Sequence, residues 1–266
     1  MSATTCIAAL ETRALISVAG EDWRSFLQGL LTQDVETLAP GEARFGALLT
    51  PQGRLLYDLF IVGRAEGCWL DCAADKRAAL LQRLAIYKLR AKVTLAADET
   101  PVLAAWGAAP AGGWIADPRL AALGWRGYGV GAAPNAVEAD YERHRLEVGA
   151  PGPADWGEDA AYPLEADFDL MNGVDFRKGC FVGQETTSRM KRRGSVKSRM
   201  LPIRFEGPAP AHGAEVLAGT LRAGEVRSGA DGVAMALVRL DRIEGAALTV
   251  DGRPCEVLRP AWMGAG

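Results

Sequence analysis

Reactive and charged side chains are most concentrated between residues 178 and 194, in the segment KGCFVGQETTSRMKRRG. Cys180 follows Arg177, Lys178 and Gly179. Neighbouring cations favour the thiolate, which is the reactive form of cysteine. Gly179 and Gly183 permit backbone conformations barred to other residues, which would allow a tight loop around the sulfur. The alternative is a surface turn with a small buried cysteine, followed by a solvated basic strand.

The rest of this segment adds an amide, a carboxylate and a run of cations. It resembles the signature of the YgfZ-type family, the folate-binding relatives of the glycine-cleavage T-protein, which is K-G-C-aromatic-x-G-Q-E followed by a spaced Arg and Arg-Gly. The matching positions are Lys178, Gly179, Cys180, Phe181, Gly183, Gln184, Glu185, Arg189, Arg193 and Gly194. The resemblance implies a tetrahydrofolate-binding protein that supports assembly or repair of iron–sulfur clusters and requires the cysteine. The segments LAIYKLRAKV, ADPRLAALGWR and PLEADFDLMNGVDFRKGC most resemble the mitochondrial and alphaproteobacterial branch of the family, which is associated with late assembly of 4Fe–4S clusters.

A second stretch, LLTQDVETLAPGEARFGALLTPQGRLLYDLFIV, resembles the part of the T-protein that contacts folate. There an aromatic residue precedes a hairpin and an acid at the pterin follows it. The aromatic position falls on Phe45 and the acid on Asp58. The T-protein usually carries two adjacent acids, and here the first is Tyr57. The resemblance therefore implies reduced folate as cofactor, while Tyr57 argues against aminomethyl-transfer chemistry.

Composition limits the classes of function. The 266 residues are 49% hydrophobic and 24% charged, as is ordinary for a globular protein. The net charge of −3 argues against a general nucleic-acid binder, so direct nucleic-acid binding is not expected. Because no run of about 18 apolar residues occurs, no membrane partner is expected either. The amino-terminal stretch has no basic region leading an apolar core, so no signal peptide is predicted.

Cysteine usage indicates the compartment and the metal chemistry. Five scattered cysteines, an odd number, argue against a disulfide framework and favour a reducing cytoplasm, so we expect a cytoplasmic protein. No C-x-x-C pair occurs and there are only two histidines. The chain alone is therefore not expected to hold a metal, and Cys180 would be a ligand only to a transient cluster shared with a scaffold or carrier protein.

The patterns along the chain predict an α+β protein. Helical spacing of apolar residues is expected over 21–31, with Asp22 as its cap, and over 76–89 and 136–146. Strands are expected over 7–18, 44–50, 54–62, 68–72, 92–96 and 101–109. Beyond residue 194, short alternating strands with Gly and Pro turns predict a small β-barrel.

The resemblance to the T-protein implies three parts, with two antiparallel sheet-plus-helix layers around a central cavity and a carboxy-terminal β-barrel. The expected first domain is discontinuous and comprises residues 1–20 and 99–160. The second comprises 21–98 and 161–194 and carries the folate-site strands and the Cys180 motif. The barrel comprises 195–266.

Three functions remain open at this point. The first is a folate-binding accessory factor for 4Fe–4S assembly or repair, in which Cys180 is a cluster ligand or an attacking thiolate. The second is a folate-dependent aminomethyl- or methyltransferase that uses Asp58, so whether the protein is an enzyme stays open. The third is a factor in tRNA modification, disfavoured because no aromatic residues interleave the basic run to stack on bases.

Overall fold

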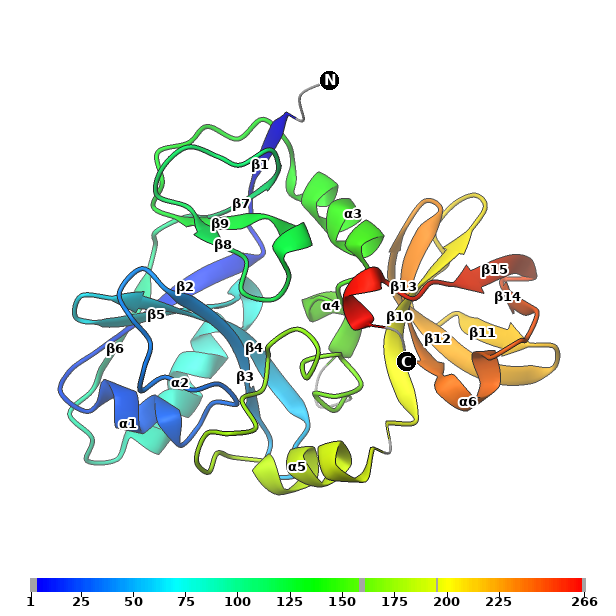
Figure 1. The fold of residues 1–266 in the computed structure, drawn as a ribbon. Helices are drawn as coiled ribbons and strands as arrows, with labels where there is room; N and C mark the ends of the chain where they lie inside the picture. Colours follow the sequence, from blue (N-terminus) through cyan, green and yellow to red (C-terminus); the bar gives the residue numbers. More distant parts are fainter. Residues whose placement is uncertain (1–3, 158–160, 195, 265–266) are drawn as a thin grey trace.

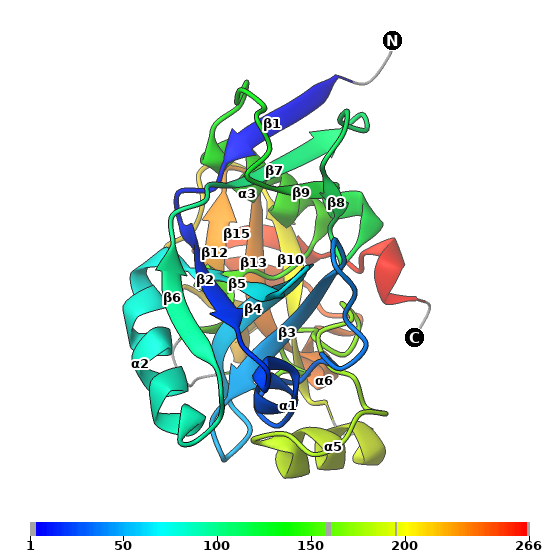
Figure 2. The same cartoon turned by 90° about the vertical axis from the view of Figure 1, so that its left-hand side faces the viewer.

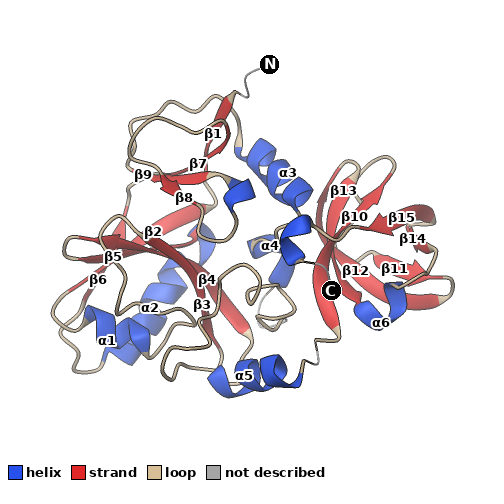
Figure 3. Cartoon of the chain, viewed as in Figure 1, coloured by secondary structure: helices blue, strands red, loops and turns tan. Residues whose placement is uncertain are grey.

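The computed structural model describes residues 4–157, 161–194 and 196–264, which form two antiparallel sheets and a closed barrel (Figures 1 and 3). The α+β class and the carboxy-terminal barrel predicted from the sequence are confirmed. None of the described helices is long and apolar enough to cross a membrane.

The larger sheet has five strands in the order β3-β4-β5-β2-β6. The strands are β2 (Arg13–Ala19), β3 (Ala43–Leu49), β4 (Leu55–Arg64), β5 (Gly67–Ala73) and β6 (Thr94–Asp98). On one face Leu59 and Ile61 pack with α1 (Trp23–Gln28) and α2 (Arg77–Lys88). The other face turns Phe60 toward the middle of the molecule, because successive side chains of a strand alternate between faces.

The smaller sheet has the order β1-β7-β9-β8. Its strands are β1 (Thr5–Ala9), β7 (Val102–Gly107), β8 (Ile115–Ala116) and β9 (Trp125–Tyr128). It packs on α3 (Glu138–Val148), which is followed by the short α4 (Pro153–Trp156). These two helices lie between the sheets and the barrel (Figure 1).

The barrel closes in the order β10-β13-β12-β11-β14-β15 around its own apolar core. Its elements are β10 (Ser198–Phe205), β11 (Glu215–Ala218), β12 (Leu221–Ala230), β13 (Val233–Arg239), α6 (Leu240–Ile243), β14 (Leu248–Val250) and β15 (Arg253–Val257). The helix α5 (Gln184–Arg193) precedes it and lies at the bottom of the molecule in Figures 1 and 2.

Two predictions about the amino-terminal region differ from the structure. Strand β2 pairs with β5 and β6, so residues 13–19 belong to the larger sheet and not with the smaller one. The first helix covers only Trp23–Gln28, and the Asp22 carboxylate makes no cap hydrogen bond to it. Asp22 instead accepts a hydrogen bond from the Lys92 amide at 2.8 Å, which ties the start of α1 to the chain entering β6.

Candidate functional site

Cys180 lies in the loop that leads into α5, and its side chain is exposed. Cys68 and Cys72 are buried in the larger sheet, where burial raises the pKa of both thiols to about 12. Cys255 is half-buried, and burial raises its pKa as well. Of the five cysteines, all within the described residues, Cys180 is thus the one exposed thiol. Such a thiol is accessible to a reagent or to a second protein.

Lys178 fastens this loop to the rest of the molecule. Its ammonium group donates three hydrogen bonds, which matches its three N–H bonds. The acceptors are the backbone carbonyl oxygens of Gln28 at 2.7 Å, Leu31 at 2.6 Å and Gln33 at 3.0 Å. Burial lowers the pKa of Lys178 to about 8. The lysine expected to favour a thiolate at Cys180 is therefore engaged in anchoring the loop.

The glycines of the motif have unequal roles. Gly183 has φ +80°, and a Cβ atom there would lie 2.6 Å from the Thr50 carbonyl oxygen and 2.9 Å from the Gly53 Cα. The start of α5 is thus pressed against the turn between β3 and β4. Gly179 has no positive φ and open space where a Cβ would be. Only Gly183 of these two is required by geometry, contrary to the expectation that Gly179 shapes the loop.

Helix α5 replaces the basic strand considered as the alternative from sequence. Arg189, Arg192 and Arg193 are exposed on it, as is Glu185 in its first turn, while Gln184 is half-buried. Gly194 ends the helix in the left-handed conformation, with φ +59°. The loop with Cys180 is therefore followed by an exposed, mainly cationic helix.

The acidic stretch before the motif partly pairs with this basic segment. Asp169 contacts Lys191 of α5 at 3.3 Å and Arg199 of β10 at 3.0 Å. Asp167 also contacts Arg199, at 2.7 Å, while its other oxygen, Oδ2, is buried without a hydrogen-bond partner among the described residues. Burial raises the pKa of Asp167 to about 8, with Arg199 opposing this shift.

Asp58 lies on β4 opposite Ala47, is 4% exposed, and forms an ion pair with Arg13 at 2.7 Å. Arg13 also contacts Asp71 at 2.6 Å, and Asp71 contacts Arg126 of the smaller sheet at 2.8 Å. Burial alone would lower the pKa of Arg13, but Asp58 and Asp71 outweigh it and raise the pKa. The carboxylate expected at a pterin is therefore also a member of a buried ionic chain between the sheets.

This ionic chain continues through Asp117 and Arg119, which lie in the segment D-P-R between β8 and β9. Arg126 contacts Asp117 at 3.4 Å, and Arg119 contacts Asp117 at 2.8 Å and the Tyr141 hydroxyl at 2.9 Å. Burial alone would raise the pKa of Asp117, but Arg119 and Arg126 hold it below its usual value. The Arg126 guanidinium lies 3.5 Å from the centroid of the Phe60 ring. Sequence reasoning missed most of this network, because buried arginines have no local signal.

The ring of Phe45, the residue expected to contact folate, is buried on β3 among other aromatic side chains. Its ring is 1% exposed and packs between Phe60, at a centroid distance of 5.1 Å, and Phe168, at 4.6 Å. Its residue borders a small polar groove with Pro118, whereas Asp58 borders a different cavity. Although both residues lie on paired strands, the structure does not bring them together as one binding surface.

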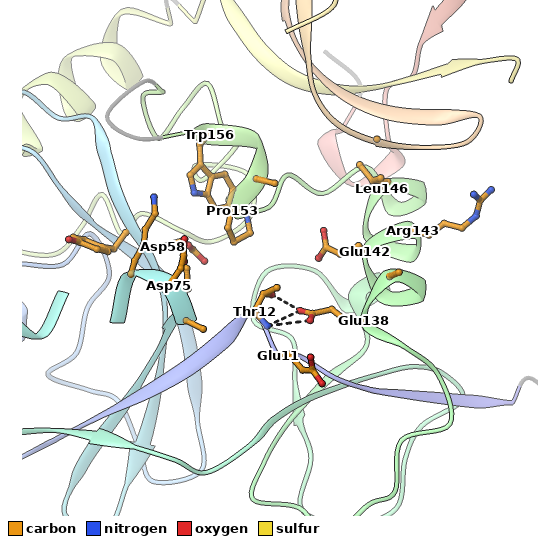
Figure 4. A pocket seen from close by; sticks show the side chains of 18 of the residues that line it. Glu11, Thr12, Asp58, Asp75, Glu138, Glu142, Arg143, Leu146, Pro153 and Trp156 are labelled. Atoms are coloured by element: carbon orange, nitrogen blue, oxygen red, sulfur yellow. Dashed lines mark hydrogen bonds between the residues drawn. The ribbon is translucent and has the colours of Figure 1, made fainter. Parts of the chain in front are cut away.

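The cavity beside Asp58 has a volume of about 1050 Å³ and lies among β4, α3, α4 and β12 (Figure 4). Figure 4 shows Asp58 and Trp156 on one side and Glu138, Glu142 and Arg143 of α3 on the other. Among the charged residues in its described lining, carboxylates outnumber cations. The acids are Glu11, Asp58, Asp75, Glu138 and Glu142, against the cations Lys76 and Arg143. The Glu138 carboxylate accepts a hydrogen bond from the Thr12 amide at 3.2 Å.

The architecture of two sheet-and-helix layers around this cavity, with a carboxy-terminal barrel, defines the class of protein. It is similar to the crystal structure of the glycine cleavage system aminomethyltransferase T from Bartonella henselae, with a TM-score of 0.77. That match covers 98% of this chain and 87% of that one, at 19% identity, so it establishes the fold alone. Residues 197–265 also match the family model of the CAF17 C-terminal beta-barrel domain.

Sequence relatives identify the family within that fold. The human iron-sulfur cluster assembly factor IBA57, mitochondrial, is 34% identical, covering 89% of this chain and 78% of the relative. The mouse protein of the same name is 33% identical, covering 91% and 80%. The chain belongs to the IBA57 family of iron–sulfur cluster assembly factors. The expected kinship with iron–sulfur cluster assembly factors of T-protein-like fold is thereby confirmed.

The same comparison corrects one prediction. A cytoplasmic location was inferred from cysteine usage, but both relatives carry the designation mitochondrial. The inference failed because scattered free cysteines indicate only a reducing environment and do not distinguish one such compartment from another.

Proposed function

We propose that this protein acts in the assembly or repair of 4Fe–4S clusters, with Cys180 meeting a cluster carried by a partner protein. The observation that carries the proposal is the placement of Cys180, an exposed thiol on a loop held in position by Lys178 and Gly183. The family relatives named as assembly factors support the same role.

A partner protein is needed because the described part of the chain offers too few ligands for a 4Fe–4S cluster. A 4Fe–4S cluster takes four ligands, usually thiolates. Among the described residues no group of three or more His, Cys, Asp or Glu could hold a metal ion. Cys180 would therefore supply one thiolate, as a ligand or as an attacking group, and an iron–sulfur scaffold or carrier would supply the remaining ligands. The cations of α5 favour a partner whose surface beside its cluster is acidic.

An anaerobic pull-down tests this proposal. Tagged wild-type protein, Cys180→Ser and the matched control Cys255→Ser would be incubated with a purified, cluster-loaded scaffold protein. We expect wild type and Cys255→Ser to retain the partner together with iron and sulfide, and Cys180→Ser to lose the bound iron. Equal iron retention by Cys180→Ser would contradict a role for this thiol.

We also propose that the cavity beside Asp58 binds a reduced folate. Asp58 fits the pterin part, because a carboxylate can accept hydrogen bonds from adjacent N–H groups. Arg13 forms an ion pair with this carboxylate at the cavity wall, at 2.7 Å. Phe45 does not fit as a contact, because its ring is enclosed by Phe60 and Phe168. When bound, a reduced folate would supply one-carbon chemistry, and the Asp58 carboxylate would accept hydrogen bonds from its pterin ring.

Calorimetry with 5-formyltetrahydrofolate tests the second proposal. Asp58→Asn should weaken binding by about 1.5–3 kcal/mol, the usual contribution of a hydrogen bond to a charged group. Asp75→Asn, which removes an exposed carboxylate of the same cavity, serves as the matched control and should bind like wild type. Circular dichroism would verify that each variant is folded at the temperature used. No binding by wild type, or equal binding by Asp58→Asn, would overturn this assignment.

A further inference from the structure

The carboxy-terminal end of α2 carries an exposed apolar pair that the fold does not use. Ile86 is 74% exposed and Leu89 is 87% exposed, the highest values among the exposed large hydrophobic residues of the described chain. Ile86 lies in the last turn of α2, and Leu89 is the first residue after the helix, so both are at its carboxy-terminal end. The helix buries Leu80 and Leu84 against the larger sheet, and this burial is what holds the helix in place.

Cations surround this apolar pair without acids among them. Between Asp75 and Asp98 the sequence contains no Asp or Glu, although the whole chain has a net charge of −3. The cations in that interval are Lys76, Arg77, Arg83, Lys88, Arg90 and Lys92. Arg77 pairs with Glu99 at 2.9 Å and Lys92 with Glu21 at 2.7 Å.

Four cations lie within three positions of the apolar pair in the sequence; Lys92 is the one paired with Glu21, whereas Arg83, Lys88 and Arg90 form no ion pair with any described residue. Their charge is thus available to an external anion. We name Arg83, Ile86, Lys88, Leu89 and Arg90 the α2 tip.

We propose that the α2 tip binds the surface of an anionic lipid membrane. Apolar side chains flanked by cations suit the boundary between acyl chains and anionic head groups, where both parts of the pattern gain free energy. Helix α2 lies at the outer edge of the molecule in Figure 2, so a flat surface can reach it. No transmembrane span is needed, so the lack of an apolar run in the sequence does not oppose this contact.

The shape of the tip favours lipid over an acidic protein. The helix ends at Lys88, and the next residue, Leu89, has a φ of +46°, a conformation that bulky residues rarely adopt. The chain therefore holds an exposed leucine at a projecting helix end. A protein partner would need a fitted pocket for two projecting side chains, whereas a lipid surface accommodates them by displacing head groups. Helix α5 also exposes cations, but it has no comparable exposed apolar pair.

Vesicle co-sedimentation of the full chain tests this proposal. One set of vesicles would be phosphatidylcholine alone, and the other would contain about 30 mol% phosphatidylglycerol. At low salt we expect roughly fivefold or greater enrichment on the anionic vesicles, falling sharply at about 0.5 M KCl. The double variant Ile86→Ser/Leu89→Ser and the double variant Arg83→Gln/Arg90→Gln should each reduce the bound fraction several-fold.

Two controls separate the α2 tip from other surfaces. Val137→Ser changes an apolar side chain that is 63% exposed but lies beside Glu138 and Asp140, and it should leave binding unchanged. Arg192→Gln/Arg193→Gln on α5 should also leave it unchanged. Circular dichroism would confirm that each variant is folded. No enrichment of wild type on anionic vesicles, full binding by Ile86→Ser/Leu89→Ser, or loss only in the α5 variant would overturn the proposal.

Discussion

Replacing Gly183 by alanine should displace the loop that carries Cys180. Two effects add at this position. The left-handed backbone conformation, with φ +80°, costs an alanine about 1–2 kcal/mol. The new Cβ would also meet the Thr50 carbonyl oxygen at 2.6 Å and the Leu49 Cβ at 3.0 Å, and overpacking of this kind typically costs about 1–3 kcal/mol. Together they predict a loss of about 2–5 kcal/mol in the free energy of unfolding.

Two other glycines of the same motif provide matched controls. Gly194 has φ +59° with no atom within 4 Å of an added Cβ, so Gly194→Ala should show the backbone effect alone. Gly179 has neither feature, and Gly179→Ala should stay within about 0.5 kcal/mol of wild type. Urea unfolding followed by tryptophan fluorescence measures all three. The reasoning is refuted if Gly183→Ala is no more destabilising than Gly194→Ala.

Three further predictions concern charge and reactivity. Burial raises the pKa of Asp167 to about 8 in the folded state, whereas the unfolded chain releases this proton above about pH 4. The contribution of Asp167 to the free energy of unfolding therefore falls as pH rises from about 4 to 8. Asp167→Asn should therefore gain stability relative to wild type between pH 5.5 and 8, by at most about 1.4 kcal/mol per pH unit, and urea unfolding that shows a constant difference would contradict this. Asp71→Asn leaves Arg13 and Arg126 without their shared carboxylate and should cost about 3–5 kcal/mol in the same assay, against less than about 0.5 for the exposed Asp75→Asn. Iodoacetamide at neutral pH should modify Cys180 before the other cysteines, as mass spectrometry of peptides would show; equal rates would make Cys180 an ordinary structural thiol.

Local patterns in the sequence predicted elements whose partners are close along the chain. The hairpin of β3 and β4 and the strand β5 follow from alternation and turn residues, and α2 follows from the helical spacing of Leu80 and Leu84. The short, turn-rich strands after residue 194 likewise predicted a barrel. In each case the signal lies within about a dozen residues, where side-chain periodicity determines which face is buried.

Long-range contacts could not be read in this way. The pairing of β2 with β5 and with β6 joins residues at least fifty positions apart in both cases, and nothing in the sequence of β2 indicates which strands it pairs with. In the sequence Phe45 looks like a ligand contact, but in the structure its ring is covered by Phe168, from a loop more than a hundred residues away. Lys178 was expected to act on the thiol, but its acceptors are backbone carbonyls at the end of α1 and in the turn that follows it.

The candidate site was predicted in part. The motif located the exposed thiol and the glycine that positions it, because rare residue types in close spacing are visible in one sequence. The ionic chain from Asp58 through Arg13 and Asp71 was not visible in the sequence. Asp and Arg are usually exposed, and these side chains become buried only when the two sheets meet.

The most direct test of the central claim is restoration of 4Fe–4S enzyme activity in cells that lack their own assembly factor of this family. Wild type, Cys180→Ser and Cys255→Ser would be expressed at matched levels, and the activity of a 4Fe–4S enzyme would be measured in extracts together with its abundance. The proposed function predicts that wild type and Cys255→Ser restore activity, while Cys180→Ser leaves the enzyme present but without its cluster. Full restoration by Cys180→Ser would contradict the claim that this thiol meets the cluster.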